Sequence, residues 1–450
     1  MKPILPTFTF LIVLAAASAV TPAAGSPPAP APVGVTAAYV DGLVAEGRAH
    51  NAALRSAEAQ TGAAEAAVSA VRTWADPMAT FGVWAPTARG MKSSQLGDLV
   101  YGVEEQLPLY GRPDLTRSVA SADAASARFA AEAQSQRLRR DIRVALDGLA
   151  LAGLQADVAG QDLAWIDATL SEVDHRYRVG RASQVDWLRI QTARAVAGED
   201  LKSRERDLDH AALALNRLLN RDLHAAWPRI ATPVLRPPLS FSSRLVEAAR
   251  AGEPQLKVMR QESVSAQAAA DLTRRQRLPD VSLGLETRQY SGDGGIREGM
   301  VTVNFSVPWL NRNRYDDEWR RDRLRKRSSE LAAEDYETSV QEELHHHVLE
   351  LEAARRKALL YRDQLIPLTR QTLSSAQAAW EANLGPFQDV LDAHRMLLAD
   401  QLALAQALTD QDGMLTEIAL LAGIPDPDSL FALEEATPST NDSAANADPK

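Results

Sequence analysis

The spacing of apolar and polar residues changes twice in each half of the chain. Residues 36–74 have a helical pattern that breaks near Asn51, and beyond it apolar residues recur at every second position. This alternation is clearest at Val281, Leu283 and Leu285. A period of two indicates strands with one apolar and one polar face. The pattern predicts four strands in two hairpins, at residues 78–85, 99–107, 280–287 and 300–307.

A longer pattern, with steps of three and four residues, follows each strand pair. In the first half it runs without a slip through Ile142, Ala145, Leu149, Ala152, Ala156, Ala159, Leu163, Ile166, Leu170, Val173 and Tyr177. This spacing is a coiled-coil heptad seam. It predicts a long helix over residues 115–177 and a returning helix over 184–219. The second half repeats the seam from Val340 to Leu368, where Pro367 is expected to kink the helix.

The two halves are copies of one unit. Several residues recur 202 positions later, namely Leu43, Leu54, Pro77 and Gly82 as Leu245, Leu256, Pro279 and Gly284. A repeat of this length indicates a duplicated structural unit, here with the order helix, strand, strand, helix, helix. We expect the first unit to span residues 37–232 and the second residues 233–433.

Composition supports a mainly helical protein with a small β part. Hydrophobic residues make up 45% of the 450 residues, but aromatic residues only 5%. Such a sequence, rich in Ala, is typical of long helices packed side by side. The net charge of −10 argues against a nucleic-acid partner; it suits a cation-conducting lumen and also plain solubility. The absence of Cys excludes disulfides, thiolate metal sites and Cys nucleophiles.

The ends of the chain differ from the rest in composition. Residues 1–24 have the charge and apolar run of a secretory signal peptide, residues 25–36 are a flexible lead-in, and residues 434–450 are predicted to be disordered. No later segment has the ~18 uninterrupted apolar residues of a spanning helix. If the mature chain crosses a membrane, it must use strands. Four strands cannot close a barrel, so closure requires several chains, and three chains would supply about twelve strands.

Each strand pair is followed by a sharp turn. Pro108, Tyr110 and Gly111 in the first unit correspond to Pro308, Trp309 and Asn311 in the second. Gly and Asn tolerate a left-handed backbone best, so the same turn is predicted twice. Tyr110 and Trp309 could mark a membrane interface, although ordinary packing between domains would also explain them.

The turns between the long helices are the most specific local signal. Tyr177 is followed three residues later by Gly180, and Trp380 is followed three residues later by Asn383. By itself this spacing is that of a plain helical hairpin. With the duplication and the Pro-containing turns, however, it resembles the TolC family of outer-membrane efflux channels over residues 37–423.

This resemblance implies a homotrimer. In such a trimer, four strands per chain would form a twelve-strand barrel in the lipid of the outer membrane of a Gram-negative bacterium. The helices would form an α-barrel in the periplasm. The resemblance also implies two protein partners, a periplasmic adaptor and an inner-membrane pump of the RND type. It suggests the branch that serves exporters of heavy-metal cations, although this chain lacks the N-terminal Cys that anchors many of those relatives.

The resemblance also assigns site residues. Asp389 and Asp392 would ring the periplasmic mouth, and Trp380 would occupy the gating position. Crowded carboxylates attract cations, whereas the alternative is two solvated aspartates on a helix face. Gly385 stands where some relatives have the Arg that ties the closed state, and Arg189 stands in the first unit where Asp392 stands in the second. The residues expected to face the adaptor are Val179, Gly180, Arg181, Asn383, Leu384 and Gly385.

The sequence gives little indication of metal binding or catalysis. Adjacent helical residues point about 100° apart, so His345, His346 and His347 cannot share one metal ion. No catalytic constellation, cofactor motif or metal-binding spacing is present in the sequence. We therefore predict a passive outer-membrane channel of a tripartite efflux system. The alternative is a periplasmic coiled-coil adaptor or scaffold, which would not need four alternating strands; an enzyme is a distant third.

Overall fold

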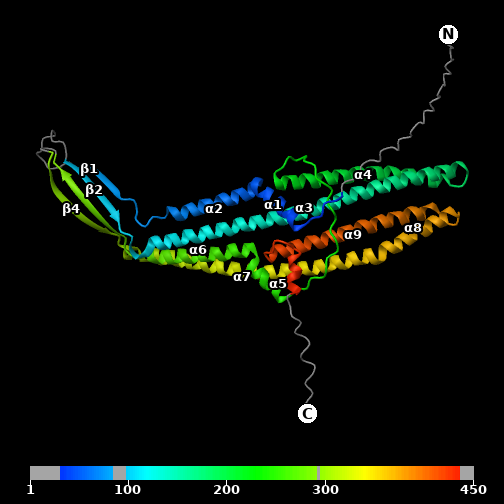
Figure 1. The fold of residues 1–450 in the computed structure, drawn as a ribbon. Helices are drawn as coiled ribbons and strands as arrows, with labels where there is room; N and C mark the ends of the chain where they lie inside the picture. Colours follow the sequence, from blue (N-terminus) through cyan, green and yellow to red (C-terminus); the bar gives the residue numbers. More distant parts are fainter. Residues whose placement is uncertain (1–30, 85–97, 291–293, 436–450) are drawn as a thin grey trace, which may run out of the picture.

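The protein is long and narrow, with a β-sheet at one end and the tips of two helical hairpins at the other (Figure 1). A computed structural model describes residues 31–84, 98–290 and 294–435. The predicted signal peptide, the first half of the lead-in, the loop of the first strand hairpin and nearly all of the predicted tail lie outside these residues.

Each half contains helix, strand, strand and long helices, as the duplication predicts. The first half comprises α1 (Ala37–His50), α2 (Ala52–Ala70), β1 (Met78–Trp84), β2 (Asp98–Gln106), α3 (Arg112–Arg178) and α4 (Gln184–Leu219). The second comprises α5 (Ser243–Gly252), α6 (Pro254–Gln276), β3 (Val281–Gln289), β4 (Ile296–Phe305), α7 (Arg312–Leu360), α8 (Ile366–Glu381), α9 (Phe387–Leu421) and a terminal α10 (Ser429–Glu435). The 3-10 turns η1 (Leu109–Gly111) and η2 (Pro308–Asn311) join strands to helices.

The predicted break in the N-terminal helix of the first unit is confirmed, and the second unit has an equivalent break. Asn51 separates α1 from α2, and its side chain accepts a hydrogen bond from the Leu54 amide at 3.1 Å. Glu253, 202 positions later, separates α5 from α6 and caps the Leu256 amide in the same way. A side-chain acceptor at this position satisfies an N–H group that the new helix leaves without a partner.

The four strands form one antiparallel sheet in the order β1-β2-β3-β4. The register aligns alternate residues on the two faces, so that Val103 pairs with Leu285, which in turn pairs with Val301. These three side chains are exposed, as are several other large apolar residues of their face, among them Phe81, Leu283, Val303 and Phe305. On the opposite face Glu104 accepts hydrogen bonds from Ser282 and Asn304. The predicted apolar and polar faces are thus confirmed.

The second strand hairpin is longer than the sequence pattern suggests. The structure extends β3 to Gln289 and begins β4 at Ile296, within the predicted loop. Polar contacts hold this extension: Arg288 donates to Asp98 at 2.9 Å across to β2, and Tyr290 donates to Glu298. Because these side chains are charged or polar, the apolar alternation gave no sign of them.

The predicted long helix is confirmed as α3, a single helix of 67 residues and so about 100 Å long. Its seam is buried at Ile142, Leu149, Ala159, Ile166 and Val173. α3 contacts α4 of its own unit and both α6 and α9 of the second unit. It therefore joins the two halves, and Figure 1 shows these helices running side by side.

Three apolar clusters lie along the helices. Two are related by the duplication: one gathers Leu43, Leu54, Ile142 and Leu219, and the other Leu245, Leu344, Leu415 and Ile418. The third, near the hairpin tips, contains Ile166, Val173, Ile190, Phe387 and Leu391. It packs the tip of the first hairpin against that of the second.

The prediction of one turn made twice after the strands is wrong. In η1 the left-handed residues are Tyr110 and Gly111, with φ of 64° and 67°. Asn311 has a φ of −116°. The second turn begins one residue earlier relative to its proline and reaches Arg312 with negative φ at Asn311, so it needs no left-handed residue there.

Pro367 affects the helix just before it. Tyr361–Leu365 form a single π-helical turn between α7 and α8. Proline cannot donate to the carbonyl four residues earlier, and a π turn absorbs this disruption within a continuous helix. Among the described residues, no helix is long and apolar enough to cross a membrane.

Candidate functional site

The candidate site is the shared end of the two helical hairpins, opposite the sheet (Figure 1). The first hairpin turns between α3 and α4, with Gly180 at a φ of 74°. Ser183 then starts α4 with a capping box, accepting from the Asp186 amide at 3.1 Å while Asp186 accepts from the Ser183 amide. Val179, Gly180 and Arg181 are exposed on this turn.

The second turn has the equivalent backbone. Asn383 has a φ of 58°, so the predicted correspondence with Gly180 is confirmed. The Asn383 amide donates to the Trp380 carbonyl at 3.1 Å, and the Leu384 amide donates to the Ala379 carbonyl at 2.8 Å. Leu384 is 85% exposed, the most exposed large apolar side chain described. A Cβ added to Gly385 would lie 3.1 Å from that of Ala379, so a larger residue would crowd the turn.

Asp389 and Asp392 are both exposed near the start of α9. They are three residues apart, which places them on neighbouring positions of one helix face. Asp389 lies in the first helical turn, where the positive end of the helix dipole favours a negative charge. Asp392 accepts hydrogen bonds from Gln388 at 2.8 and 2.9 Å, and Arg395 lies 3.9 Å from it. The structure thus leaves both carboxylates open to ions from outside.

Trp380 is half-buried and is held by a residue from the other hairpin. The Arg176 guanidinium stacks over its ring at 4.0 Å and also donates to the Trp380 carbonyl at 3.4 Å. Glu172 pairs with Arg176 at 2.7 Å, which orients the guanidinium. Nothing in the sequence points to Arg176, since cations near a helix end are common and no spacing connects residues 176 and 380.

A second cross-hairpin contact lies further from the tips. The His394 ring on α9 stacks on Trp165 of α3 with ring centroids 3.7 Å apart. Its Nε2 is 2.8 Å from an Asp162 carboxylate oxygen, also on α3. His394 is buried, and the sequence analysis did not single it out. A buried His with a carboxylate and an aromatic neighbour fixes the rotation of one hairpin against the other.

The remaining predicted residues lie elsewhere. Tyr110, Gly111, Trp309 and Asn311 are exposed where the sheet meets the helices, with Pro108 half-buried and Pro308 buried beside them. His345 and His346 are exposed midway along α7, and His347 is half-buried. Within the described residues, no group of three or more His, Cys, Asp or Glu could hold a metal ion.

Part of the chain matches a known family. Residues 245–423 match the family described as "Outer membrane efflux protein", in agreement with the resemblance found in the sequence. No curated protein matches the chain by sequence.

Several solved structures share the fold. The outer-membrane channel OprN has a TM-score of 0.74 at 18% identity, covering 85% of this chain and 89% of its own. CusC, whose conformational changes accompany folding and transmembrane channel formation, has a TM-score of 0.75 at 17% identity, covering 90% of this chain and 99% of its own. VceC of Vibrio cholerae has a TM-score of 0.71 at 17% identity over 86% and 96%. These similarities show that the fold is shared over 85–90% of this chain.

Proposed function

Taking the chain as a TolC-family outer-membrane protein, we propose that it is the exit duct of a tripartite efflux system. Its family is one of channels rather than enzymes. In the proposed role the chain itself supplies no energy. An inner-membrane pump, of the RND type, would drive transport, and a periplasmic adaptor would connect the two.

The observation that carries this proposal is the unpartnered apolar face of the sheet. Val103, Leu285 and Val301 form a row across three strands, and all are exposed. A water-exposed face this apolar is rare on a soluble protein. A periplasmic adaptor or scaffold has no need of it, whereas a membrane channel places such a face against lipid.

The free sheet edges support a trimer. Within the described residues β1 and β4 each pair on one side only. An open edge leaves backbone groups unsatisfied, which lipid does not tolerate. If β4 of one chain pairs with β1 of the next, three chains close a twelve-strand barrel, and the helical hairpins below it form one hollow cylinder.

At the opposite end, we propose that the hairpin tips form the periplasmic gate. Trp380 with Arg176 would hold the two hairpins in the closed arrangement, in place of the Arg that Gly385 replaces. The residues at the turns, exposed Val179, Gly180, Arg181, Asn383 and Leu384 and half-buried Gly385, would face the adaptor. The exposed carboxylates Asp389 and Asp392 would ring the mouth, and a cation preference there fits heavy-metal cargo.

Removal of the two carboxylates tests the ring. In planar bilayers, the double variant Asp389→Asn, Asp392→Asn should reduce the cation-to-anion permeability ratio by about two- to fivefold, because charge at a constriction sets the local ion concentration. Asp363→Asn, which removes an exposed carboxylate remote from the tip on the same hairpin, should leave the ratio unchanged. Equal ratios in the double variant and the unmodified channel would refute the ring.

Fractionation of cells tests the proposed role as an exit duct. If the proposal is right, the protein is a trimer that needs detergent for extraction from the outer membrane. A monomer in the soluble periplasm would instead support the adaptor or scaffold.

A further inference from the structure

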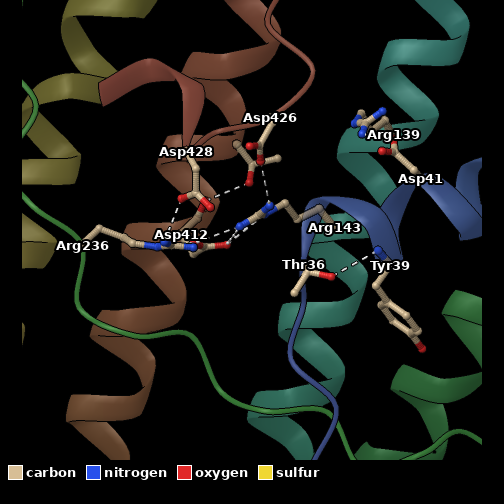
Figure 2. Close-up of polar contacts among 10 residues, drawn as sticks. Thr36, Tyr39, Asp41, Arg139, Arg143, Arg236, Asp412, Asp426 and Asp428 are labelled. Carbon is tan, nitrogen blue, oxygen red and sulfur yellow. Dashed lines mark hydrogen bonds and ion pairs between the residues drawn. The ribbon is translucent and has the colours of Figure 1, made fainter. Parts of the chain in front are cut away.

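A buried cluster of charges lies where the first unit meets the second (Figure 2). α3 contributes Arg143 and Asp147, and α9 contributes Asp412, all three of them buried. The segment between α4 and α5 contributes Arg236, and the segment after α9 contributes Asp426 and Asp428. Arg143 and Asp147 lie near the middle of α3 (Arg112–Arg178), the helix that runs from the sheet to the tip of the first hairpin (Figure 1).

Asp412 is the centre of this cluster. Arg143 contacts it at 3.1 Å through Nε and at 3.0 Å through a terminal nitrogen. The Nε of Arg236 lies 3.6 Å from the other oxygen of Asp412. Two guanidinium groups thus contact this one carboxylate, whose oxygens can accept further hydrogen bonds.

Asp147 has no such support. It lies one helical turn beyond Arg143 and is only 2% exposed. Both of its carboxyl oxygens are buried, and neither accepts a hydrogen bond from the described residues. A buried carboxylate without donors is costly, whereas a protonated carboxyl can itself donate. Asp412, which Arg143 also contacts, is the neighbouring carboxylate whose charge and hydrogen bond act on Asp147.

We propose that Asp147 and Asp412 hold one proton between them, and that this proton fastens the first unit to the second. The O–H of Asp147 on α3 donates to the Asp412 carboxylate on α9. Loss of the proton places two carboxylates in contact inside the joint, and their repulsion drives α3 and α9 apart. The joint is therefore sensitive to alkaline pH.

The surrounding charges agree with this assignment. Burial first, and then the negative charge of Asp412, raise the pKa of Asp147 to about 8, while Arg143 and Arg236 lower it only in part. Asp426 and Asp428 pair with the same two arginines, since Asp428 lies 2.7 Å from Arg236 and Asp426 lies 3.9 Å from Arg143. Four carboxyl groups thus share two guanidinium groups, and one retained proton reduces the excess negative charge.

The direction of the pH effect follows from linkage. The pKa of Asp147 in the folded joint is above its value in an opened joint. The folded joint therefore binds the proton more tightly, and the stability this confers is present at low pH and lost as pH rises through about 8. Below that pH, the equilibrium constant for separating α3 from α9 should rise about tenfold per pH unit. Above it, the equilibrium constant should level off.

The test uses the full chain as its native oligomer in detergent. Isotope-edited infrared titration from about pH 6 to about pH 10 should show the band of one protonated Asp carboxyl per chain, lost with a midpoint near pH 8. Asp147→Asn, which keeps the shape and a donor, should lack the band. The matched control Asp207→Asn removes an exposed carboxylate on α4 and should retain it.

Hydrogen exchange measures the consequence. In the unmodified protein, amides of α3 and α9 around the cluster should lose protection as pH rises to about 8, beyond the intrinsic base catalysis of exchange. Asp147→Asn should remove this extra loss. The proposal is overturned if the unmodified protein shows no protonated carboxyl near neutral pH, or if Asp147→Asn keeps the band. Should that variant fail to fold, the titration of the unmodified protein alone decides.

Discussion

At the scale of single residues, Arg176 and Asp147 show what the sequence pattern conceals. Both lie on α3, a helix that the heptad spacing predicts well. Arg176 gains its role from a ring that is 204 positions away, and Asp147 from a carboxylate that is more distant still. A seam of apolar residues locates the helix face but does not tell which polar residues will be enclosed beside it.

The contact of Arg176 with Trp380 can be tested by a single substitution. Arg176→Gln should remove a cation–π contact worth about 1 kcal/mol, so the closed state should lose about fivefold in population and single-channel opening should increase. Arg178→Gln is the control, because Arg178 is exposed and pairs within its own helix with Asp174. If both variants open alike, Arg176 does not hold the gate.

At the scale of elements, the end of α5 packs closely against the backbone that follows α9. Gly252 ends α5, and Gly423, with a φ of 66°, follows α9. A Cβ on Gly252 would overlap the Ala422 carbonyl, whose carbon would lie 2.8 Å away. Backbone atoms cannot rotate aside as a side chain does. Gly252, at the break between α5 and α6, therefore has no room for a side chain where it packs against the end of α9.

Gly252→Ala should consequently destabilise the fold by about 1–3 kcal/mol, as overpacking does. Gly413→Ala, inside α9, should have the opposite sign and stabilise by up to about 1 kcal/mol, because a Cβ there meets nothing within 4 Å and Ala is the better helix former. Denaturant unfolding of the two variants measures both effects. Equal stability of Gly252→Ala and the unmodified chain would contradict the packing account.

At the scale of the whole molecule, the two faces of the sheet decide how chains assemble. One face carries a row of exposed apolar side chains, and the other carries polar residues such as Thr80, Glu104 and Ser282. The same strand thus offers two environments at adjacent positions. Assembly into a membrane should tolerate a charge on one face and reject it on the other.

Leu285→Arg should therefore block assembly, since an Arg facing lipid costs about 2–4 kcal/mol per chain near the middle of the bilayer. Thr80→Arg places the same side chain on the polar face and should assemble normally. Heat-resistant oligomer in outer-membrane fractions is the measurement. Normal assembly of Leu285→Arg would mean that this face does not meet lipid.

The sequence by itself determined the elements and their order. The break at Asn51, the helix from 184 to 219 and the alternating strand faces depend on local periodicity and on local hydrogen bonds, which neighbours in sequence supply. The hairpin turn at Asn383 followed from the same local logic. The duplication added the arrangement of the halves, because two similar units pack similar surfaces.

Only the tertiary structure decided which distant residues meet. The turn at Asn311, the extension of β3 past Thr287, the Arg176–Trp380 contact and the cluster around Asp412 each depend on a partner from another element. Such partners are chosen by packing, and the cost of burying a charge or crowding a backbone is set by what surrounds it. Spacing along the chain carries no information about those surroundings.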